Sequence, residues 1–345
     1  MVILQQPDAL TFSHNIMDVR IENNTAIDVV IYKNGAQKVV EKYYPNSANK
    51  ITIKLKDFVK NQLSAQLPSN LALPLYHQSG AYASFSISLN NNEQVLNFVA
   101  ITGGLNVANQ QNYLTQNFLT LQNQVKEIQE SEIQFLTFYA NQANLKVKIK
   151  AYFNDATNQE IEYQTLVQGQ LNLINTSFNV IKNSFNKTIK CYDVSIVAGT
   201  TVLGYVQRYI LNYTHFFNRN LFIFENSQGG LDTIAMDGQL KIKPSLETKT
   251  ALFDETIKDY YNNPEIVYSK NTGYIKTPAN KIWHTDFLNS KNKWFLKDGV
   301  FVAIVVQKVS AEIQKGFLND FDFDFITAEK QLNLTPNRMV LQNFI

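Results

Sequence analysis

Apolar and polar residues alternate with a period of two along most of this sequence, whereas the longer period of amphipathic helices is scarce. The clearest unit runs over residues 26–33, Asn34-Gly35 and residues 36–44. Asn34 and Gly35 both tolerate the positive φ that a type I′ turn requires, so this unit predicts a β-hairpin. Side chains alternate between the two faces of a strand, so the wider pattern predicts sheets with one buried face.

Further strands are expected from the same alternation, at 50–56, 82–89, 93–101, 135–139, 145–153, 160–167, 192–197, 202–211, 220–225, 274–276, 293–296, 300–309 and 320–326. Short helices are expected at 57–63, capped by Asp57, and near 254–261. The Gln-rich passage 106–131 fits a helix, strands or loops. No short repeat and no βαβ alternation occurs. The fold class expected is therefore all-β and mainly antiparallel, with two or more β-sandwich or jelly-roll-like domains and a few short helices.

The length of 345 residues allows two or three domains, each with its own core. Gly103-Gly104 ends the first region of alternation and gives a first boundary. The division expected is an N-terminal β-sandwich at 1–105, a second β-sandwich at 106–245 and a C-terminal β-rich region at 246–345. In one arrangement, the C-terminal region packs on the second domain.

Charge is low and dispersed: 17% of the residues are charged, the net charge is +2, and Lys and Arg are scattered. A nucleic-acid partner is not expected, because phosphate contacts need a basic stripe. The hydrophobic fraction of 45% argues against disorder. A weakly charged surface rich in Asn and Gln suits faces that meet other subunits, and it equally suits the codon bias of an AT-rich genome.

Neither export nor membrane insertion is expected from the sequence. The N-terminus has no basic start followed by an apolar run, so no signal peptide is predicted and synthesis in the cytoplasm is expected. The longest apolar run, 300–306, has the length of a strand and is far short of the roughly 18 residues that cross a bilayer. The single cysteine, Cys191, excludes an internal disulfide and is interpreted as a small core residue.

The sequence contains no motif for catalysis or for a cofactor, so no catalytic residue and no cofactor are predicted and an enzyme is not expected. The four histidines have no metal-ligand spacing: His14, His77, His215 and His284. Gly103-Gly104 and Gly229-Gly230 fit no phosphate-binding loop and are interpreted as turns that need positive φ.

One acidic pattern is a weak candidate metal site. Asp320, Asp322 and Asp324 alternate with Phe321, Phe323 and Phe325. A strand here places three carboxylates on one face and three rings on the other. The carboxylates fit a calcium-attracting ladder. The interpretation that we favour is a strand with buried rings and a wet outer face that discourages aggregation.

Four aromatic residues in polar C-terminal surroundings are candidates for a protein interface or for stacking on sugar rings: Tyr260, Tyr261, Trp283 and Trp294. The alternative for each is a place in a sandwich core.

Three groups of passages, spread in order over most of the chain, carry a resemblance to a known group of proteins. They are QPDALTFSHN at 6–15 with EKYYP at 41–45 and ITIKLKD at 51–57; NFLT at 117–120 with IQFLTF at 133–138; and LFIFENSQGGLDT at 221–233 with NTGYI at 271–275. These passages resemble uncharacterised tail-region and virion structural proteins of Bacteroidetes tailed phages and prophages. The third departs from the pattern at Gln228 and Leu231, where bulkier or aromatic residues are expected.

The resemblance implies a bacteriophage virion structural protein of the tail or baseplate type, built of β-sandwiches. It implies action through subunit–subunit interfaces, as a homo-oligomer with other virion proteins, and a mature location in the virion. It transfers no catalytic residue. Two alternatives stay open: a double jelly-roll capsid protein with two similar halves, and a carbohydrate-binding or adhesin module that recognises host surface glycans.

Overall fold

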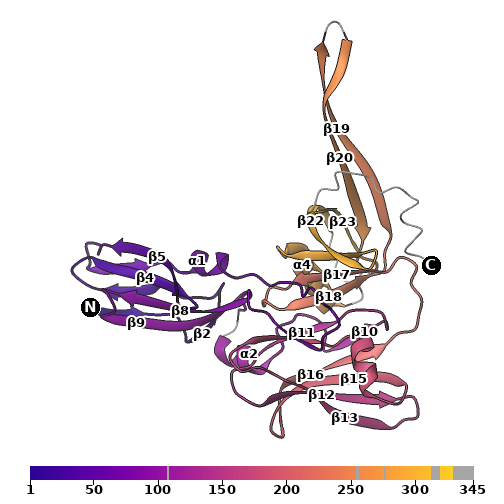
Figure 1. Ribbon diagram of the computed structural model, residues 1–345, viewed down its shortest axis with the longest axis horizontal. Coiled ribbons are helices and arrows are strands. Elements are labelled where there is room, and N and C mark those ends of the chain that lie inside the picture. Colours follow the sequence, from indigo (N-terminus) through magenta and orange to yellow (C-terminus); the bar gives the residue numbers. More distant parts are fainter. Residues whose placement is uncertain (107–108, 254–255, 276, 312–318, 329–345) are drawn as a thin grey trace. The chain divides into compact units, whose positions relative to one another are not determined.

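The computed structural model describes residues 1–106, 109–253, 256–275, 277–311 and 319–328, and within its strands the side chains of 245–248, 253, 258–264 and 311 lie outside the description. About 51% of the chain is strand and 11% is helix (Figure 1). The predicted fold class is confirmed: several mostly antiparallel sheets form a multi-domain all-β protein with few short helices. The chain divides into two compact units, with unit 1 holding Met1–Thr214, Phe224–Thr233 and Thr285–Ser290.

Unit 1 begins with a sandwich of two sheets. The smaller sheet has the order β1 (Val2–Gln5), β3 (Val19–Glu22) and β6 (Lys50–Ile53). The larger has the order β2 (Leu10–Phe12), β9 (Gln94–Ile101), β8 (Tyr82–Leu89), β4 (Ile27–Lys33) and β5 (Ala36–Tyr43). Alternate residues of both sheets, such as Ile21, Ile53, Val29 and Phe85, are buried in one shared core with Val59 of helix α1 (Lys56–Asn61).

A second sandwich in unit 1 repeats this plan. Its smaller sheet has the order β11 (Phe135–Tyr139), β14 (Leu171–Asn175) and β7 (Leu75–His77). Its larger sheet has the order β10 (Val125–Ile128), β16 (Thr201–Leu211), β15 (Ile189–Ala198), β12 (Leu145–Phe153) and β13 (Asn158–Thr165). The short helices here are α2 (Gln110–Gln116), α3 (Phe178–Ile181) and the 3-10 turn η1 (Lys182–Ser184).

The two sandwiches share an immunoglobulin-like strand order. In each large sheet a short edge strand runs parallel to the last strand, as β2 does to β9 and β10 to β16, and the remaining pairs are antiparallel. A helix follows β6 and another follows β14, before the last two strands of each sandwich. The order β9, β8, β4 in one sandwich and β16, β15, β12 in the other corresponds to strands G, F and C of an immunoglobulin sandwich, with one further strand at each edge. The halves differ in that β1 pairs with β3, whereas β7 pairs with β14.

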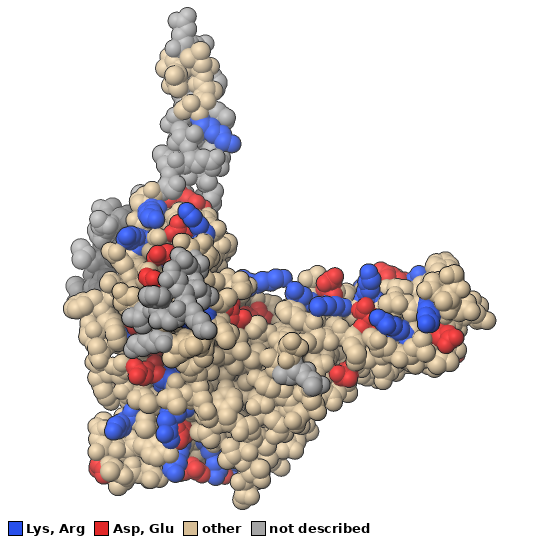
Figure 2. All heavy atoms as spheres, turned by 180° about the vertical axis from the view of Figure 1, so that it is seen from behind, with Lys and Arg blue, Asp and Glu red and all other residues tan. Residues whose placement is uncertain are grey.

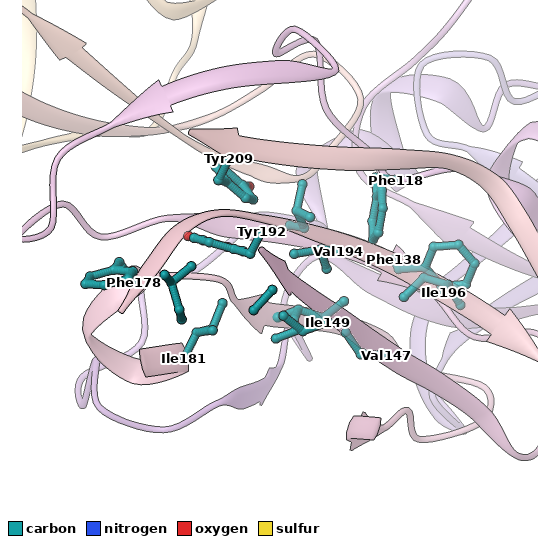
Figure 3. Close-up of a cluster of buried hydrophobic side chains, with 14 of the residues drawn as sticks. Phe118, Phe138, Val147, Ile149, Phe178, Ile181, Tyr192, Val194, Ile196 and Tyr209 are labelled. Carbon is teal, nitrogen blue, oxygen red and sulfur yellow. The ribbon is translucent and has the colours of Figure 1, made fainter. Parts of the chain in front are cut away.

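Strand β12 shows how the alternation builds a sandwich face. Its apolar residues, among them Val147 and Ile149, are buried in the core of Figure 3. The lysines between them face outward, where Lys148 Nζ lies 2.7 Å from Glu160 Oε1 of the neighbouring β13. The same core contains Tyr192, whose hydroxyl donates a 2.6 Å hydrogen bond to the Thr176 carbonyl oxygen at the end of β14. Immunoglobulin-like sandwiches use a tyrosine at this corner in the same way.

Unit 2 is built on a seven-stranded sheet. Its order is β18 (Leu231–Met236), β17 (Asn220–Glu225), β21 (Lys293–Lys297), β22 (Val300–Ala311), β23 (Phe321–Thr327), β20 (Thr256–Asn271) and β19 (Leu240–Phe253), and its helix is α4 (Pro278–Asn289). Segment Phe224–Thr233 of β17 and β18, and Thr285–Ser290 around the end of α4, belong to unit 1. The core of unit 2 is aromatic: Tyr268 and Phe325 stack at 5.1 Å, and Phe222 and Phe295 do the same at 5.1 Å.

Local predictions meet three outcomes. The hairpin turn is confirmed, because Asn34 and Gly35 have φ of 50° and 78° between β4 and β5. The predicted helix at 57–63 is present as α1, but Asp57 lies in its first turn and Leu55 is the N-cap. The predicted helix near 254–261 is wrong: residues 256–261 begin β20 and pair with β19, and residues 254–255 lie outside the described part.

The domain boundaries predicted at 105 and 245 stay predictions. Strand β7 lies before residue 105 in the sequence and pairs with β14, so segments from both sides of that boundary share a sheet. No described helix is long and apolar enough to cross a membrane.

Candidate functional site: the β19–β20 ribbon

Strands β19 and β20 form a two-stranded ribbon that extends beyond the sheet of unit 2 (Figure 1). The two strands pair continuously from the Leu240–Lys270 pair to the Phe253–Thr256 pair. Strand β23 pairs with β20 only over Tyr268–Asn271. Over residues 256–267, β19 is therefore the only described strand that pairs with β20. At about 3.3 Å per residue, this free part is roughly 40 Å long.

The tip of the ribbon carries an apolar pair. Leu252 and Ile257 are cross-strand partners, so their side chains share one face, and they are 69% and 71% exposed. Nearer the base, Ile242 is also exposed. A two-stranded ribbon buries little surface of its own and is marginally stable in water. The tip pair is therefore a candidate contact surface for a partner that would cover it.

Both strands of the ribbon contain a proline. Pro244 lies opposite Ile266, and Pro264 lies opposite Leu246, two pairs nearer the tip. Proline has no N–H to donate, and on an edge strand it discourages the addition of another strand. Each strand of the ribbon therefore contains one residue that cannot donate a backbone hydrogen bond to an added strand.

The base of the ribbon is fixed by a buried lysine. Lys270 is fully buried, and its Nζ donates hydrogen bonds to Asn220 Oδ1 at 2.7 Å, to the Asn218 carbonyl oxygen at 2.8 Å and to the Gly238 carbonyl oxygen. Burial lowers the pKa of Lys270 to about 8. Because residue 270 closes the ladder opposite Leu240, these bonds tie the base of the ribbon to the beginning of β17 and to the turn before β19.

The acidic strand has the two faces that its sequence predicts. Phe321, Phe323 and Phe325 are buried, whereas Asp320 and Asp322 are exposed. Asp324 is partly exposed, with an oxygen 4.0 Å from Lys243 Nζ. Among the described residues no group of three or more His, Cys, Asp or Glu is arranged to hold a metal ion.

Of the four candidate aromatic residues, only the two tryptophans have described side chains, and neither is exposed. Trp283 is buried in α4, with only 7% of its surface exposed, and Trp294 is partly buried in β21. Tyr260 and Tyr261 belong to the ribbon by their backbone, and their side chains lie outside the described part. The ribbon itself was not predicted from the sequence; Asn262-Asn263-Pro264 and Pro244 interrupt the alternation that marks other strands.

The two glycine pairs that were predicted as turns meet in space. Gly103 and Gly229 have the expected positive φ, of 94° and 82°, but Gly104 and Gly230 do not. The latter two are glycines for a different reason: a Cβ on Gly104 would lie 2.6 Å from His14 Cβ, and one on Gly230 would lie 2.1 Å from the Leu119 carbonyl oxygen. Close packing, and not turn geometry, explains these two positions.

Burial shifts the pKa of two titratable side chains outside the ribbon. His284 is buried in α4, with Nδ1 2.7 Å from the Asn280 carbonyl oxygen, and burial lowers its pKa. Cys191 was expected in a core, but it is only partly buried, and its pKa is raised by that partial burial. On the face that Figure 2 shows, Lys and Arg are interspersed with Asp and Glu.

Comparisons with known proteins identify no family for this chain. No protein-family model and no curated protein matches the chain. Among solved structures, a tri-modular GH5 (subfamily 4) endo-β-1,4-glucanase from Bacillus licheniformis complexed with cellotetraose is 12% identical, with a TM-score of 0.18; the match covers 59% of this chain and 37% of that one. A chimeric titin Z1Z2-Z1Z2 tandem is 8% identical, with a TM-score of 0.17; the match covers 61% of this chain and 98% of that one. Scores this low carry no argument about fold or function.

Proposed function

We propose that this chain is a structural protein of a bacteriophage virion, of the tail or baseplate type, which acts through contacts between subunits. The resemblance of its three groups of passages to virion proteins of Bacteroidetes tailed phages supports the proposed location in a virion. The observation that carries the proposal is the β19–β20 ribbon, which has an exposed Leu252–Ile257 pair at its tip.

The ribbon favours assembly on energetic grounds. Complete burial of one Leu or Ile side chain contributes about 1.5–3 kcal/mol, so the tip pair offers several kcal/mol to a partner that covers it. In an isolated chain that free energy is not realised. A ring or lattice repeats the contact in every copy, and the prolines on both edges oppose uncontrolled strand-to-strand pairing.

Electron microscopy and light scattering of the purified full-length chain test the proposal. We expect rings, sheets or another regular oligomer. In a shortened variant, Asn-Gly replaces residues 244–266 and joins Lys243 to its cross-strand partner Val267, so that β20 keeps its pairing with β23. This variant is expected to remain a folded monomer. A full-length chain that stays monomeric at every concentration would contradict the proposal.

A further inference from the structure

Beside the base of the ribbon, unit 2 contains a cavity of about 580 Å³ with a mostly polar lining. Its walls come from the segment leading into β19, the end of β20, the loop after it and the beginning of β23. The volume lies within the range of roughly 300–1,000 Å³ that is usual for small-ligand sites. Acidic and basic side chains both gather where the ribbon leaves its sheet (Figure 2).

One asparagine organises the acidic wall of this cavity. Asn271 of β20 is the cross-strand partner of Asp322 of β23. Its Nδ2 donates to Asp320 Oδ2 at 2.8 Å and to Asp322 Oδ1 at 3.0 Å, while its Oδ1 accepts the Gly273 N–H at 2.7 Å. The Nδ2 amino group of Asn271 therefore holds the two carboxylates as a pair. Each carboxylate keeps a second oxygen for a ligand.

The charges of the lining are largely compensated. Asp237 is 3.1 Å from Arg219 Nη1, and Lys241 adds a positive charge to the same lining. An anionic ligand is disfavoured because carboxylates outnumber the single lysine. A metal ion is disfavoured because no metal-holding group forms among the described residues. A neutral ligand with many hydroxyl groups fits this lining, because it donates to carboxylates and accepts from amide and ammonium groups.

An aromatic ring completes the cavity. Tyr274 lies in the loop after β20, lines the cavity and is 72% exposed. A planar ring beside paired hydroxyl acceptors offers an apolar surface to the C–H face of a sugar. We propose that this cavity binds a neutral saccharide, with Tyr274 stacking on the sugar ring and Asp320 and Asp322 accepting from neighbouring hydroxyls.

Saturation-transfer NMR on the full-length chain tests this binding independently of assembly. The probes are glucose, galactose, N-acetylglucosamine and lactose, each at about 10 mM, because a small sugar in an open site is expected to have a millimolar Kd. We expect transfer to at least one probe. Tyr274→Ala and Asp322→Asn are each expected to weaken binding about tenfold, which corresponds to one stacking contact or hydrogen bond.

Matched controls are Tyr213→Ala and Asp298→Asn, which change the same residue types at exposed positions outside the cavity and are expected to leave binding unchanged. No transfer to any of the four sugars would overturn the inference. Equal binding by the cavity variants would overturn it too. Binding of putrescine or calcium chloride instead of a sugar, lost in the same variants, would reassign the cavity to cations and also overturn it.

Discussion

Gly103 and Gly229 pack backbone to backbone: a Cβ on Gly103 would lie 2.5 Å from the Gly229 nitrogen, and one on Gly229 would lie 2.0 Å from the Thr102 carbonyl oxygen. The hydrogen bond from the Gly104 N–H to the Ser227 carbonyl oxygen, at 2.7 Å, closes the same contact. Both glycines belong to unit 1, in which the end of β9 meets the turn between β17 and β18. Neither turn has room for a side chain.

Replacement of Gly103 by alanine is expected to lower the free energy of unfolding by about 2–4 kcal/mol, because it adds a backbone clash to an unfavourable positive φ. Gly199→Ala is the control: Gly199 also has positive φ, but nothing lies within 4 Å of the position that a methyl group would take there. The control is expected to cost about 1 kcal/mol. Urea unfolding measures both values, and equal losses would show that the close packing is not important.

Tyr192 is expected to stabilise the second sandwich through its corner hydrogen bond. Tyr192→Phe removes the hydroxyl that donates to Thr176 and leaves a buried carbonyl without that donor, at a cost of about 1–3 kcal/mol. Tyr213→Phe is the control, because the Tyr213 side chain is mostly exposed and its hydroxyl bond is long, at 3.5 Å. Thermal unfolding compares the two variants. Identical melting temperatures would rule out the corner as a stabilising contact.

The buried amine of Lys270 makes stability depend on pH. Its pKa is about 8 in the folded chain, against an ordinary 10.5. Between these values the unfolded chain binds more protons than the folded one, so this group makes the free energy of unfolding rise as pH rises. Below about pH 8 both states carry the charge, and the contribution is flat.

Urea titrations from about pH 8 to about pH 10 on the natural chain and on Lys270→Met measure this contribution. We expect the free energy of unfolding to rise more across this pH range in the natural chain than in the variant. This holds whatever the difference between their stabilities at the start of the range. Tyrosines with raised pKa act in the opposite direction at higher pH, and they are common to both proteins. Parallel curves would mean that Lys270 has an ordinary pKa in the folded chain.

Sequence alone predicted the features that depend on neighbouring residues. Asn34-Gly35 sets its own turn, and the rings of Phe321, Phe323 and Phe325 are buried because strand geometry places alternate residues on one face. The ribbon was missed because none of its described side chains between residues 240 and 267 is buried, and so they give no alternation to detect. Two β-sandwiches were expected, but the strand order that they share was not predicted, because strand order depends on pairing between distant segments.

The residues of the candidate sites were likewise predicted only in part. Asp320 and Asp322 were singled out from their spacing, but Asn271 and Tyr274 were not, because only the register of β20 against β23 brings Asn271 beside Asp322. The roles of Gly104 and Gly230 depend on contacts with His14 and Leu119, which are remote in sequence. Such contacts leave no local signal.

Sedimentation velocity over a range of concentrations tests most directly whether the tip of the ribbon drives assembly. Leu252→Glu with Ile257→Lys keeps a favourable cross-strand pair and removes the apolar surface, and Val202→Glu changes an exposed valine elsewhere. The natural chain and the Val202 variant are expected to sediment as the same oligomer, and the tip variant as a monomer. An oligomer of unchanged size in the tip variant would contradict the account.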